Sequence, residues 1–139
     1  MLWPSVRDAL HQLREALAPG EWSPGKRLLA SLRDYQRLAH QPGPWALFRK
    51  RLAVLRHRFW SAVCGADIPL NAHIGGGLLL PHPNGVVIHP LAHIGPNCLI
   101  FQQVTLGTRG GAEAPVLGGH VDVGAGAKLL GYGPQRRLT

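Results

Sequence analysis

An aliphatic residue recurs every six positions in the second half of the chain, and this period constrains the fold more than any other feature. It is often followed by glycine, as in Ile74-Gly75 and Ile94-Gly95. A period of six fits neither an α-helix, which repeats every 3.6 residues, nor a hairpin sheet, which alternates by two. The aliphatic positions of the repeat are Ile68, Ile74, Leu80, Ile88, Ile94, Ile100, Leu106, Leu117, Val123 and Leu129.

Six-residue units predict a parallel β-helix. Each unit supplies a short strand whose aliphatic residue points inward, followed by a turn-prone residue at the corner. Three such units make a turn of about 18 residues, and stacked turns bury a continuous aliphatic column. We therefore expect a mainly β domain over residues 65–139.

The first half of the chain has the period of helices instead. Apolar residues recur at spacings of three and four in three stretches, 6–17, 28–38 and 45–63. Ser23 is expected to cap the second helix, with Pro24 at its first position. All four tryptophans lie in this half, and we interpret them as packing anchors. The pattern predicts an N-terminal helical segment over residues 1–64.

The net charge of +8 is concentrated in the helical segment, where eleven of the fifteen Lys and Arg residues fall within the first sixty positions. Such a patch suits nucleic acid, anionic lipid or a phosphorylated cofactor. We favour a solvated helical face, with neither nucleic acid nor membrane as a partner. The sequence has no apolar run of bilayer length and no secretory signal, and its two cysteines are too few for a disulfide framework, so we expect a cytoplasmic protein.

Two insertions interrupt the six-residue phase. Leu80 and Ile88 are separated by eight positions and enclose Pro81-His82-Pro83-Asn84-Gly85. Leu106 and Leu117 are separated by eleven and enclose a glycine-rich loop. Insertions in a solenoid leave the coil at its corners, and exposed loops on a rigid scaffold often carry binding and catalytic groups.

From about Trp45 to Gly131 the sequence resembles the serine acetyltransferase family of hexapeptide-repeat acyltransferases. The most specific pieces are H-x-x-G-V-V-I from His82, Q-x-V-T-L-G from Gln102 and the segment GAGAKLLG. The resemblance implies a left-handed parallel β-helix preceded by a helical domain. It also implies a homotrimer or a dimer of trimers that binds acetyl-CoA between subunits and acetylates the hydroxyl of serine, which supplies cysteine biosynthesis.

The family's catalytic histidine falls on His82, and the resemblance implies that its aspartate partner is Asp67. Positions 67 and 82 are 15 apart, close to one turn of about 18 residues, so we expect their side chains to meet on neighbouring turns. A carboxylate that holds one imidazole nitrogen leaves the other free to take the proton of an alcohol.

The resemblance places Gly107, Thr108, Ala125 and Lys128 at the CoA site. Small residues there let the pantetheine arm approach the backbone, and Lys128 or Arg109 can meet the CoA phosphates. No metal is expected. The other histidines of the repeat have no recognisable ligand spacing, and we interpret them as structural: His73, His89, His93 and His120.

The sequence departs from the family in its substrate loop, which reads G-D-R-H-P in the family. Here Glu113 and Ala114 replace the arginine and the histidine. Because glutamate repels a carboxylate, a sugar hydroxyl becomes the second candidate for the small-molecule acceptor. The family also continues for at least one more turn after Gly131. We therefore expect a shortened C-terminus, and a catalytically degenerate scaffold stays an alternative to an enzyme. The basic first half leaves a third alternative, a helical module that binds membrane or nucleic acid.

Overall fold

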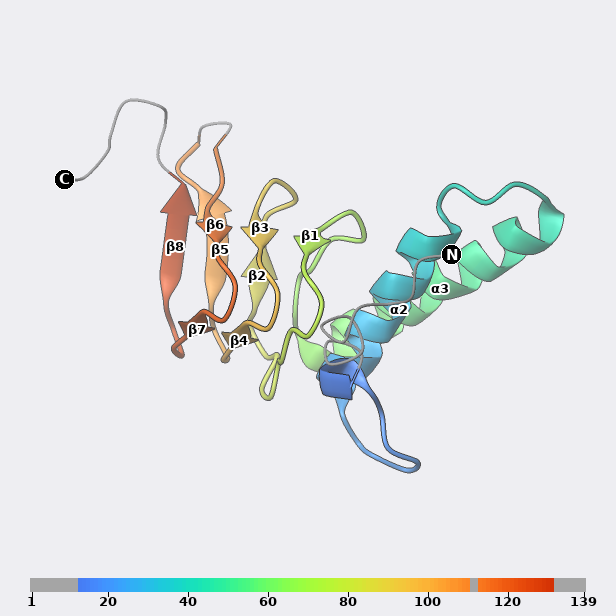
Figure 1. The fold of residues 1–139 in the computed structure, drawn as a ribbon, viewed down its shortest axis with the longest axis horizontal. Coiled ribbons are helices and arrows are strands. Elements are labelled where there is room, and N and C mark those ends of the chain that lie inside the picture. The colour runs from blue at the N-terminus through green and yellow to red at the C-terminus, as the bar shows by residue number, and fades with distance from the viewer. Residues whose placement is uncertain (1–12, 111–112, 132–139) are drawn as a thin grey trace, which may run out of the picture.

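The computed structural model describes residues 13–110 and 113–131, with two long helices at one end and a stack of short strands at the other (Figure 1). Most of the predicted helix over 6–17 lies outside the described residues. In its described part, residues 13–15 are helical. No helix of the described part of the chain combines the length and the apolar content that a membrane crossing needs.

The second and third predicted helices are confirmed as α2 (Pro24–Leu38) and α3 (Pro44–Cys64). Proline opens α2, and Ser23 occupies the N-cap position, but its hydroxyl makes no capping hydrogen bond, so that detail was wrong. Helix α3 ends at Cys64 and is capped by Gly65, whose φ of 64° is left-handed and whose N–H donates to the carbonyl of Ala62. This turn directs the chain into the first strand region.

The two helices pack through leucines of α2 and small residues of α3. Leu28, Leu29 and Leu32 are fully buried, whereas α3 buries only Ala46, Ala53 and Cys64. The larger apolar side chains of α3 remain exposed. The interpretation of the tryptophans as packing anchors is therefore wrong for Trp22 and Trp45, which are 75% and 69% exposed.

The strands form three small parallel sheets that the chain visits in turn. In the first sheet β1 (His73–Ile74) pairs with β3 (His93–Ile94), which pairs with β6 (Val116–Leu117). The second sheet has the order β2 (Val87–Ile88), β5 (Thr105–Thr108), β8 (Lys128–Gly131), and the third pairs β4 (Leu99–Ile100) with β7 (Asp122–Val123).

The register confirms the period and the two insertions. Val87 pairs with Thr105, 18 positions on, as three units of six require. His73 pairs with His93 across the first insertion, an offset of 20, and His93 pairs with Val116 across the second, an offset of 23. The excesses of two and five residues are the lengths by which each insertion exceeds six.

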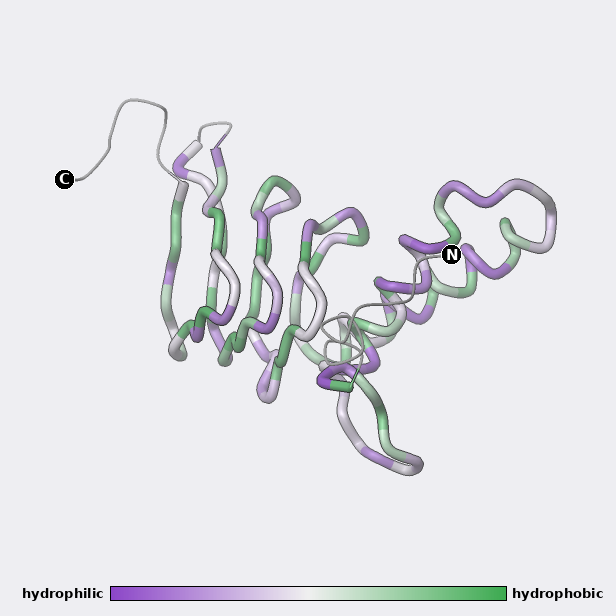
Figure 2. The backbone as a smooth tube through the Cα atoms, in the orientation of Figure 1, coloured by the Kyte–Doolittle hydropathy of each residue, from purple (hydrophilic) through white to green (hydrophobic). Residues whose placement is uncertain are grey.

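The aliphatic positions of the repeat form the core, and hydrophobic residues recur along each turn of the strand region (Figure 2). Eight of the ten are buried, and Leu117 and Leu129 are half-buried against the same cluster. This cluster continues without a break into Leu28, Leu29 and Leu32 of α2. Helices and strands therefore share one hydrophobic core.

Polar contacts also join α2 to the first turn of the strand region. The guanidinium of Arg33 donates to the carbonyls of Ile74 (2.6 Å) and Gly75 (2.8 Å), and the amide of Gln36 donates to those of Leu70 and Ala72. These bonds fix the position of α2, and the N-terminal end of α2 in turn borders the loop that carries His82.

Candidate active site

The loop that carries His82 leaves the coil where the sequence predicts, between Leu80 and Val86, and its far end is held by backbone hydrogen bonds. The N–H of Gly85 donates to the carbonyl of Gly65 (2.9 Å), and the carbonyl of Asn84 accepts from Gln103 (2.9 Å). Gly85 has a φ of +73°, and a Cβ there would lie 2.6 Å from the side chain of Gln103. Only glycine fits this corner without displacing its neighbour.

The imidazole of His82 is exposed at the tip of this loop. Among the residues that the structure describes, no side chain or backbone group makes a hydrogen bond with it. Both ring nitrogens are thus available to a ligand. A histidine that holds no structural hydrogen bond on a rigid loop is suited to accept and return a proton.

His82 borders a pocket of about 360 Å³ between the start of α2, the end of α3 and the loop. The ionisable side chains in its described lining are His82 and Cys64. Burial raises the pKa of the Cys64 thiol to about 11, so the thiol stays protonated at neutral pH. The basic group of this pocket is therefore the imidazole of His82. The lining residues are Trp22, Ser23, Pro24, Gly25, Val63, Cys64, Leu80, Pro81, His82, Pro83 and Asn84.

Asp67 lies on the strand position next to this loop, and its carboxylate is exposed. Its partner across the sheet is Val87, whereas His82 comes five residues earlier. In the described structure neither a hydrogen bond nor an ion pair joins Asp67 to His82. The first insertion lengthens this turn to 20 residues and His82 is part of that insertion, so the pairing of Asp67 with His82 stays a prediction.

The electrostatic neighbour of Asp67 is a different histidine, His57 of α3. The Nε2 atom of His57 lies 2.7 Å from the carbonyl oxygen of Ile68, so we assign the proton to Nε2. Burial lowers the pKa of His57, while the hydrogen bond to Ile68 and the charge of Asp67 oppose that shift without cancelling it. His57 is consequently neutral at pH 7.

Three of the four candidate cofactor residues lie on the sheet of β2, β5 and β8. Gly107 and Thr108 of β5 pair with Leu130 and Gly131, and Lys128 opens β8 opposite Thr105. The fourth, Ala125, is exposed at the corner that precedes β8. Asp67, Val87, Thr105 and Lys128 form one row across the sheet, which places Lys128 about 14 Å from Asp67 at a strand spacing of about 4.8 Å.

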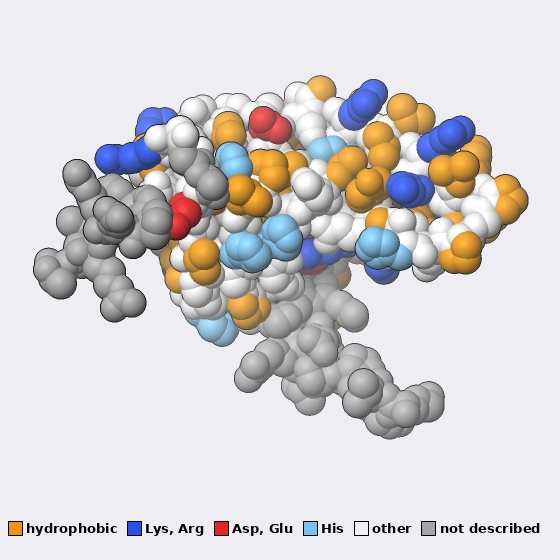
Figure 3. Space-filling model, turned by 90° about the horizontal axis from the view of Figure 1, so that it is seen from above, with side chains coloured by type: hydrophobic (Ala, Val, Ile, Leu, Met, Phe, Trp, Pro, Cys, Tyr) orange, Lys and Arg blue, Asp and Glu red, His pale blue; other side chains and the backbone are white. Residues whose placement is uncertain are grey.

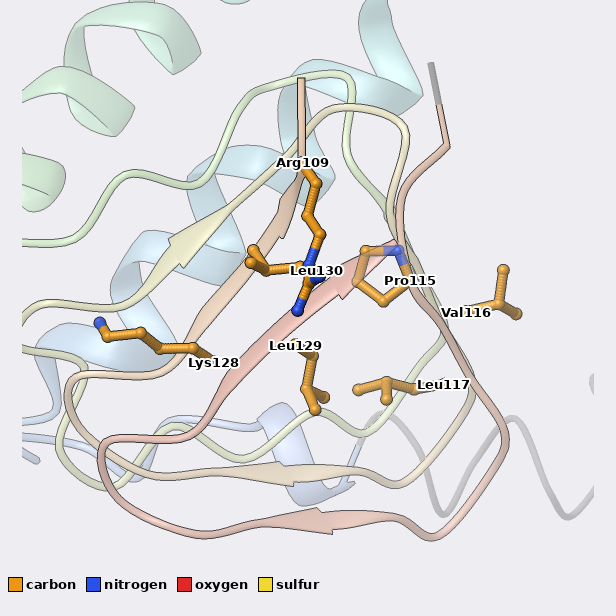
Figure 4. Close-up of a pocket in the computed structure, with 7 residues that line it drawn as sticks. All are labelled: Arg109, Pro115, Val116, Leu117, Lys128, Leu129 and Leu130. Carbon is orange, nitrogen blue, oxygen red and sulfur yellow. The ribbon is translucent and has the colours of Figure 1, made fainter. Parts of the chain in front are cut away.

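A second pocket, of about 340 Å³, lies at the last described turn (Figure 4). Its lining combines the cations Arg109 and Lys128 with five apolar residues, Pro115, Val116, Leu117, Leu129 and Leu130. Figure 4 shows Arg109 directed toward Leu130, with Lys128 on the opposite side of Leu129 from Leu117. Cations beside an apolar surface suit a ligand with phosphates and an aliphatic arm.

Glu113 and Ala114 lie beside this second pocket and pass over the end of β8. A Cβ on Gly131 would collide with the carbonyl of Glu113 and with Cα of Ala114. The loop of His82 precedes β2, which lies two strand spacings from β8, or about 10 Å along the stack. A single chain therefore brings Glu113 and Ala114 to the cofactor candidates and leaves them apart from His82.

Sequence reasoning missed Trp22 and Cys64 as neighbours of His82. Neither residue belongs to a motif, and both reach the pocket because α2 and α3 pack against the first turn. The groups of His, Cys, Asp and Glu within 13–110 and 113–131 include none of three or more that could hold a metal ion.

Comparisons with known proteins agree with this architecture, although no family model matches the chain. A serine acetyltransferase of Synechococcus elongatus is 39% identical over 114 residues, which cover 77% of this chain and 46% of that protein. A serine acetyltransferase of Helicobacter pylori is 38% identical over 117 residues, covering 73% of this chain and 68% of that protein. The chain spans under half the length of the first relative and only 29–32% of three plant relatives.

Solved structures give the same result. A Brucella abortus serine acetyltransferase in complex with coenzyme A superposes with a TM-score of 0.63 at 30% identity, over 78% of this chain and 42% of that one. A Neisseria gonorrhoeae serine acetyltransferase in complex with serine gives 0.62 at 35% identity, over 79% and 44%.

The six-residue repeat, the three parallel sheets and the histidine loop define a hexapeptide-repeat protein with a helical segment before its strands. With the relatives above, they show that the chain belongs to the serine acetyltransferase family.

Proposed function

We propose that this chain is a CoA-dependent O-acetyltransferase with serine as its acceptor, acting in cysteine biosynthesis. Family membership supports this function. The feature of the site that supports this function is His82. Its imidazole has no hydrogen-bond partner in the described structure, and it lies beside a pocket on a loop that backbone hydrogen bonds hold. No other group in that pocket's described lining is basic at neutral pH.

In this proposal one ring nitrogen of His82 takes the proton from the acceptor hydroxyl. The oxygen forms a bond to the acetyl carbonyl carbon, the carbon–sulfur bond breaks, and the departing thiolate takes the proton back from the imidazolium. Acetyl-CoA supplies the acyl thioester. Arg109 and Lys128 suit its phosphates, and the apolar wall of their pocket suits its pantetheine arm. Gly107, Thr108 and Ala125 leave the neighbouring backbone accessible to that arm.

Asp67 is the proposed orienting partner of His82. Its exposed carboxylate on the strand next to the loop supports this role. The pairing would form when the acceptor is bound or within an assembled oligomer, because it is not made in the single chain. Asp67→Asn tests the role through kcat: a positioning carboxylate lowers kcat when neutralised, whereas a purely structural one changes only the stability.

We further propose that residues 65–139 form a left-handed parallel β-helix, that residues 1–64 form its helical segment, and that the active unit is a homotrimer or a dimer of trimers. The order of the three sheets supports the β-helix. The separation of His82 from Glu113 and Ala114 within one chain supports a site assembled between copies, with one copy giving His82 and its neighbour giving the second loop. Two buried free cysteines, Cys64 and Cys98, support a cytoplasmic location.

The experiment is a measurement of CoA release from acetyl-CoA by the purified protein, with and without L-serine. Turnover that requires serine and saturates with both substrates is expected. A folded protein that binds acetyl-CoA but releases no CoA with any acceptor would contradict the enzymatic function and favour a degenerate scaffold.

A sugar hydroxyl is the second candidate acceptor, and the lining of the His82 pocket favours it. The described lining contains no Asp, Glu, Lys or Arg to meet the ammonium and carboxylate of serine. The ring of Trp22, 75% exposed, offers an apolar face to a sugar. Faster CoA release with a neutral sugar than with serine would identify this acceptor, and loss of the difference in Trp22→Ala would assign it to this pocket.

A further inference from the structure

Helix α3 exposes a line of large apolar side chains that its packing does not use. The buried residues of α3 are Ala46, Ala53 and Cys64, on the side that contacts α2 and the core. The apolar residues on the remaining surface recur at spacings of three and four, which places them along one face of the helix. With their exposed fractions, they are Trp45 (69%), Phe48 (52%), Leu52 (43%), Leu55 (59%), Phe59 (59%) and Val63 (43%). We call these six residues the apolar stripe.

Arginines border the apolar stripe on both sides. At 100° per residue, Arg49 and Arg56 lie along one border and Arg51 and Arg58 along the other, and all four are exposed. Helix α3 contains no aspartate or glutamate. Figure 3 shows the result as hydrophobic and basic side chains interspersed over the helical end of the molecule. One of the four, Arg56, donates to the carboxylate of Asp34 of α2 at 2.7 Å.

The charges argue against a second copy of α3 as the occupant of the apolar stripe. The residues of the apolar stripe are spaced like the seam of a coiled coil, and the four arginines occupy the positions that flank such a seam. Flanking positions meet each other in a helix pair, so arginine would face arginine in a parallel and in an antiparallel dimer. Like charges across such a seam are unfavourable. The occupant should therefore be anionic.

The side chains of the apolar stripe favour a lipid surface over an acidic helix. Three of the six are aromatic, and Trp45 stacks on Phe48 with ring centroids 5.7 Å apart. Coiled-coil seams prefer Leu, Ile and Val. Trp, Phe and Leu with neighbouring arginines are instead typical of helices that lie in the plane of a membrane surface.

We propose that α3 is a docking surface for an anionic lipid bilayer, with the apolar stripe inserted among the acyl chains and the four arginines at the headgroups. This differs from our expectation that the basic residues form only a solvated face. The proposal does not depend on the acetyltransferase activity, since no residue of the apolar stripe except Val63 borders the His82 pocket.

The test is co-sedimentation of the full chain with vesicles of phosphatidylcholine alone and of phosphatidylcholine with phosphatidylglycerol. We expect binding to the anionic vesicles and much weaker binding to the neutral ones. Raising the salt from about 0.1 M to about 1 M shortens the Debye length from about 10 Å to about 3 Å and should weaken the binding. Arg51→Gln with Arg58→Gln should lower the partition coefficient about 30-fold, about fivefold for each arginine.

Phe48→Ser with Leu55→Ser should lower the partition coefficient by at least about tenfold for each side chain. Two matched controls should bind as the unaltered protein does. Lys50→Gln removes a charge on the other side of α3, where the ammonium lies 5.7 Å from the ring centroid of Tyr35. Val116→Ser removes an exposed apolar side chain (73%) on β6. Circular dichroism verifies that each variant is folded.

The fluorescence of Trp45 distinguishes insertion from adsorption. Brominated lipids should quench part of the emission of the unaltered protein, and Trp45→Phe should lose that part. Three results would overturn the proposal: no binding to anionic vesicles, equal binding by the variants of the apolar stripe and the controls, or self-association that the Phe48 and Leu55 changes abolish without any vesicle binding. The last result would assign the apolar stripe to a second copy of the chain.

Discussion

Arg33 joins the helices to the strand region, and its replacement gives the sharpest test of how the candidate site is held. Its guanidinium donates to the carbonyls of Ile74 (2.6 Å) and Gly75 (2.8 Å) and pairs with Glu15 at 2.9 Å. Glu15 in turn accepts from the N–H of Gly77 (3.1 Å). The side chains of Arg33 and Glu15 are 23% and 17% exposed, so solvent screens this network only in part.

A hydrogen bond from a charged group contributes about 1.5–3 kcal/mol. Because the guanidinium retains some contact with water, we take the lower value for each of its two carbonyl bonds and assign no further energy to the ion pair. Arg33→Met, which keeps an apolar stem, should lower the free energy of unfolding by about 3 kcal/mol. Urea denaturation followed by circular dichroism should show a midpoint lower by about 1–2 M.

Arg37 provides the matched control, one turn further along α2. Its ion pair with Asp34 is exposed, with 71% of the Arg37 side chain accessible, so Arg37→Met should change the free energy of unfolding by less than about 1 kcal/mol. Equal midpoints for the two variants would refute the role given to Arg33. Equal midpoints would mean that the shared hydrophobic core alone holds α2 on the strand region.

Two further predictions concern ionisable groups near the site. The pKa of His57 is lower in the folded chain than its ordinary 6.5. As the pH falls below 6.5, the unfolded chain therefore binds more protons than the folded chain, and the free energy of unfolding should decrease. His57→Gln should flatten this slope in urea titrations across that range, and an unchanged slope would contradict the assignment. The thiol of Cys64, with its pKa raised from 9.0 to about 11, should form about 100-fold less thiolate at neutral pH than an unfolded thiol. Iodoacetamide should label Cys64 more slowly in the folded chain than in the unfolded chain, by a similar factor, as mapped by mass spectrometry. Equal labelling rates in the two states would contradict the raised pKa.

The strand region could be predicted because its signal is local. A period of six fixes which residues point inward, and the lengths of the two insertions account for the offsets of 20 and 23 in the register. The same reasoning placed His82 on an exposed loop. The contact of His82 with Asp67 stays a prediction, because the count of 15 residues was compared with an uninterrupted turn and the loop itself makes the turn longer.

Features that depend on helix packing could not be predicted in this way. Trp22 and Cys64 reach the His82 pocket from positions 60 and 18 residues earlier in the chain, and no pattern links them to the loop. The spacing of apolar residues in α3 correctly predicts a helix, but it also predicts that the face with the larger apolar side chains is the buried one. The structure buries Ala46 and Ala53 instead, because small side chains allow α2 to approach closely.

We propose that His82 acts as the base in acetyl transfer, and kcat for His82→Asn with saturating acetyl-CoA and acceptor tests this role. His120→Asn is the control, since His120 is exposed at a corner with a left-handed φ of 58° that asparagine tolerates. We expect His82→Asn to lose about 10²–10⁴ of kcat while it folds and binds acetyl-CoA normally, and His120→Asn to keep its rate. A folded His82→Asn protein that turns over as fast as the His120→Asn control would contradict a catalytic role for His82.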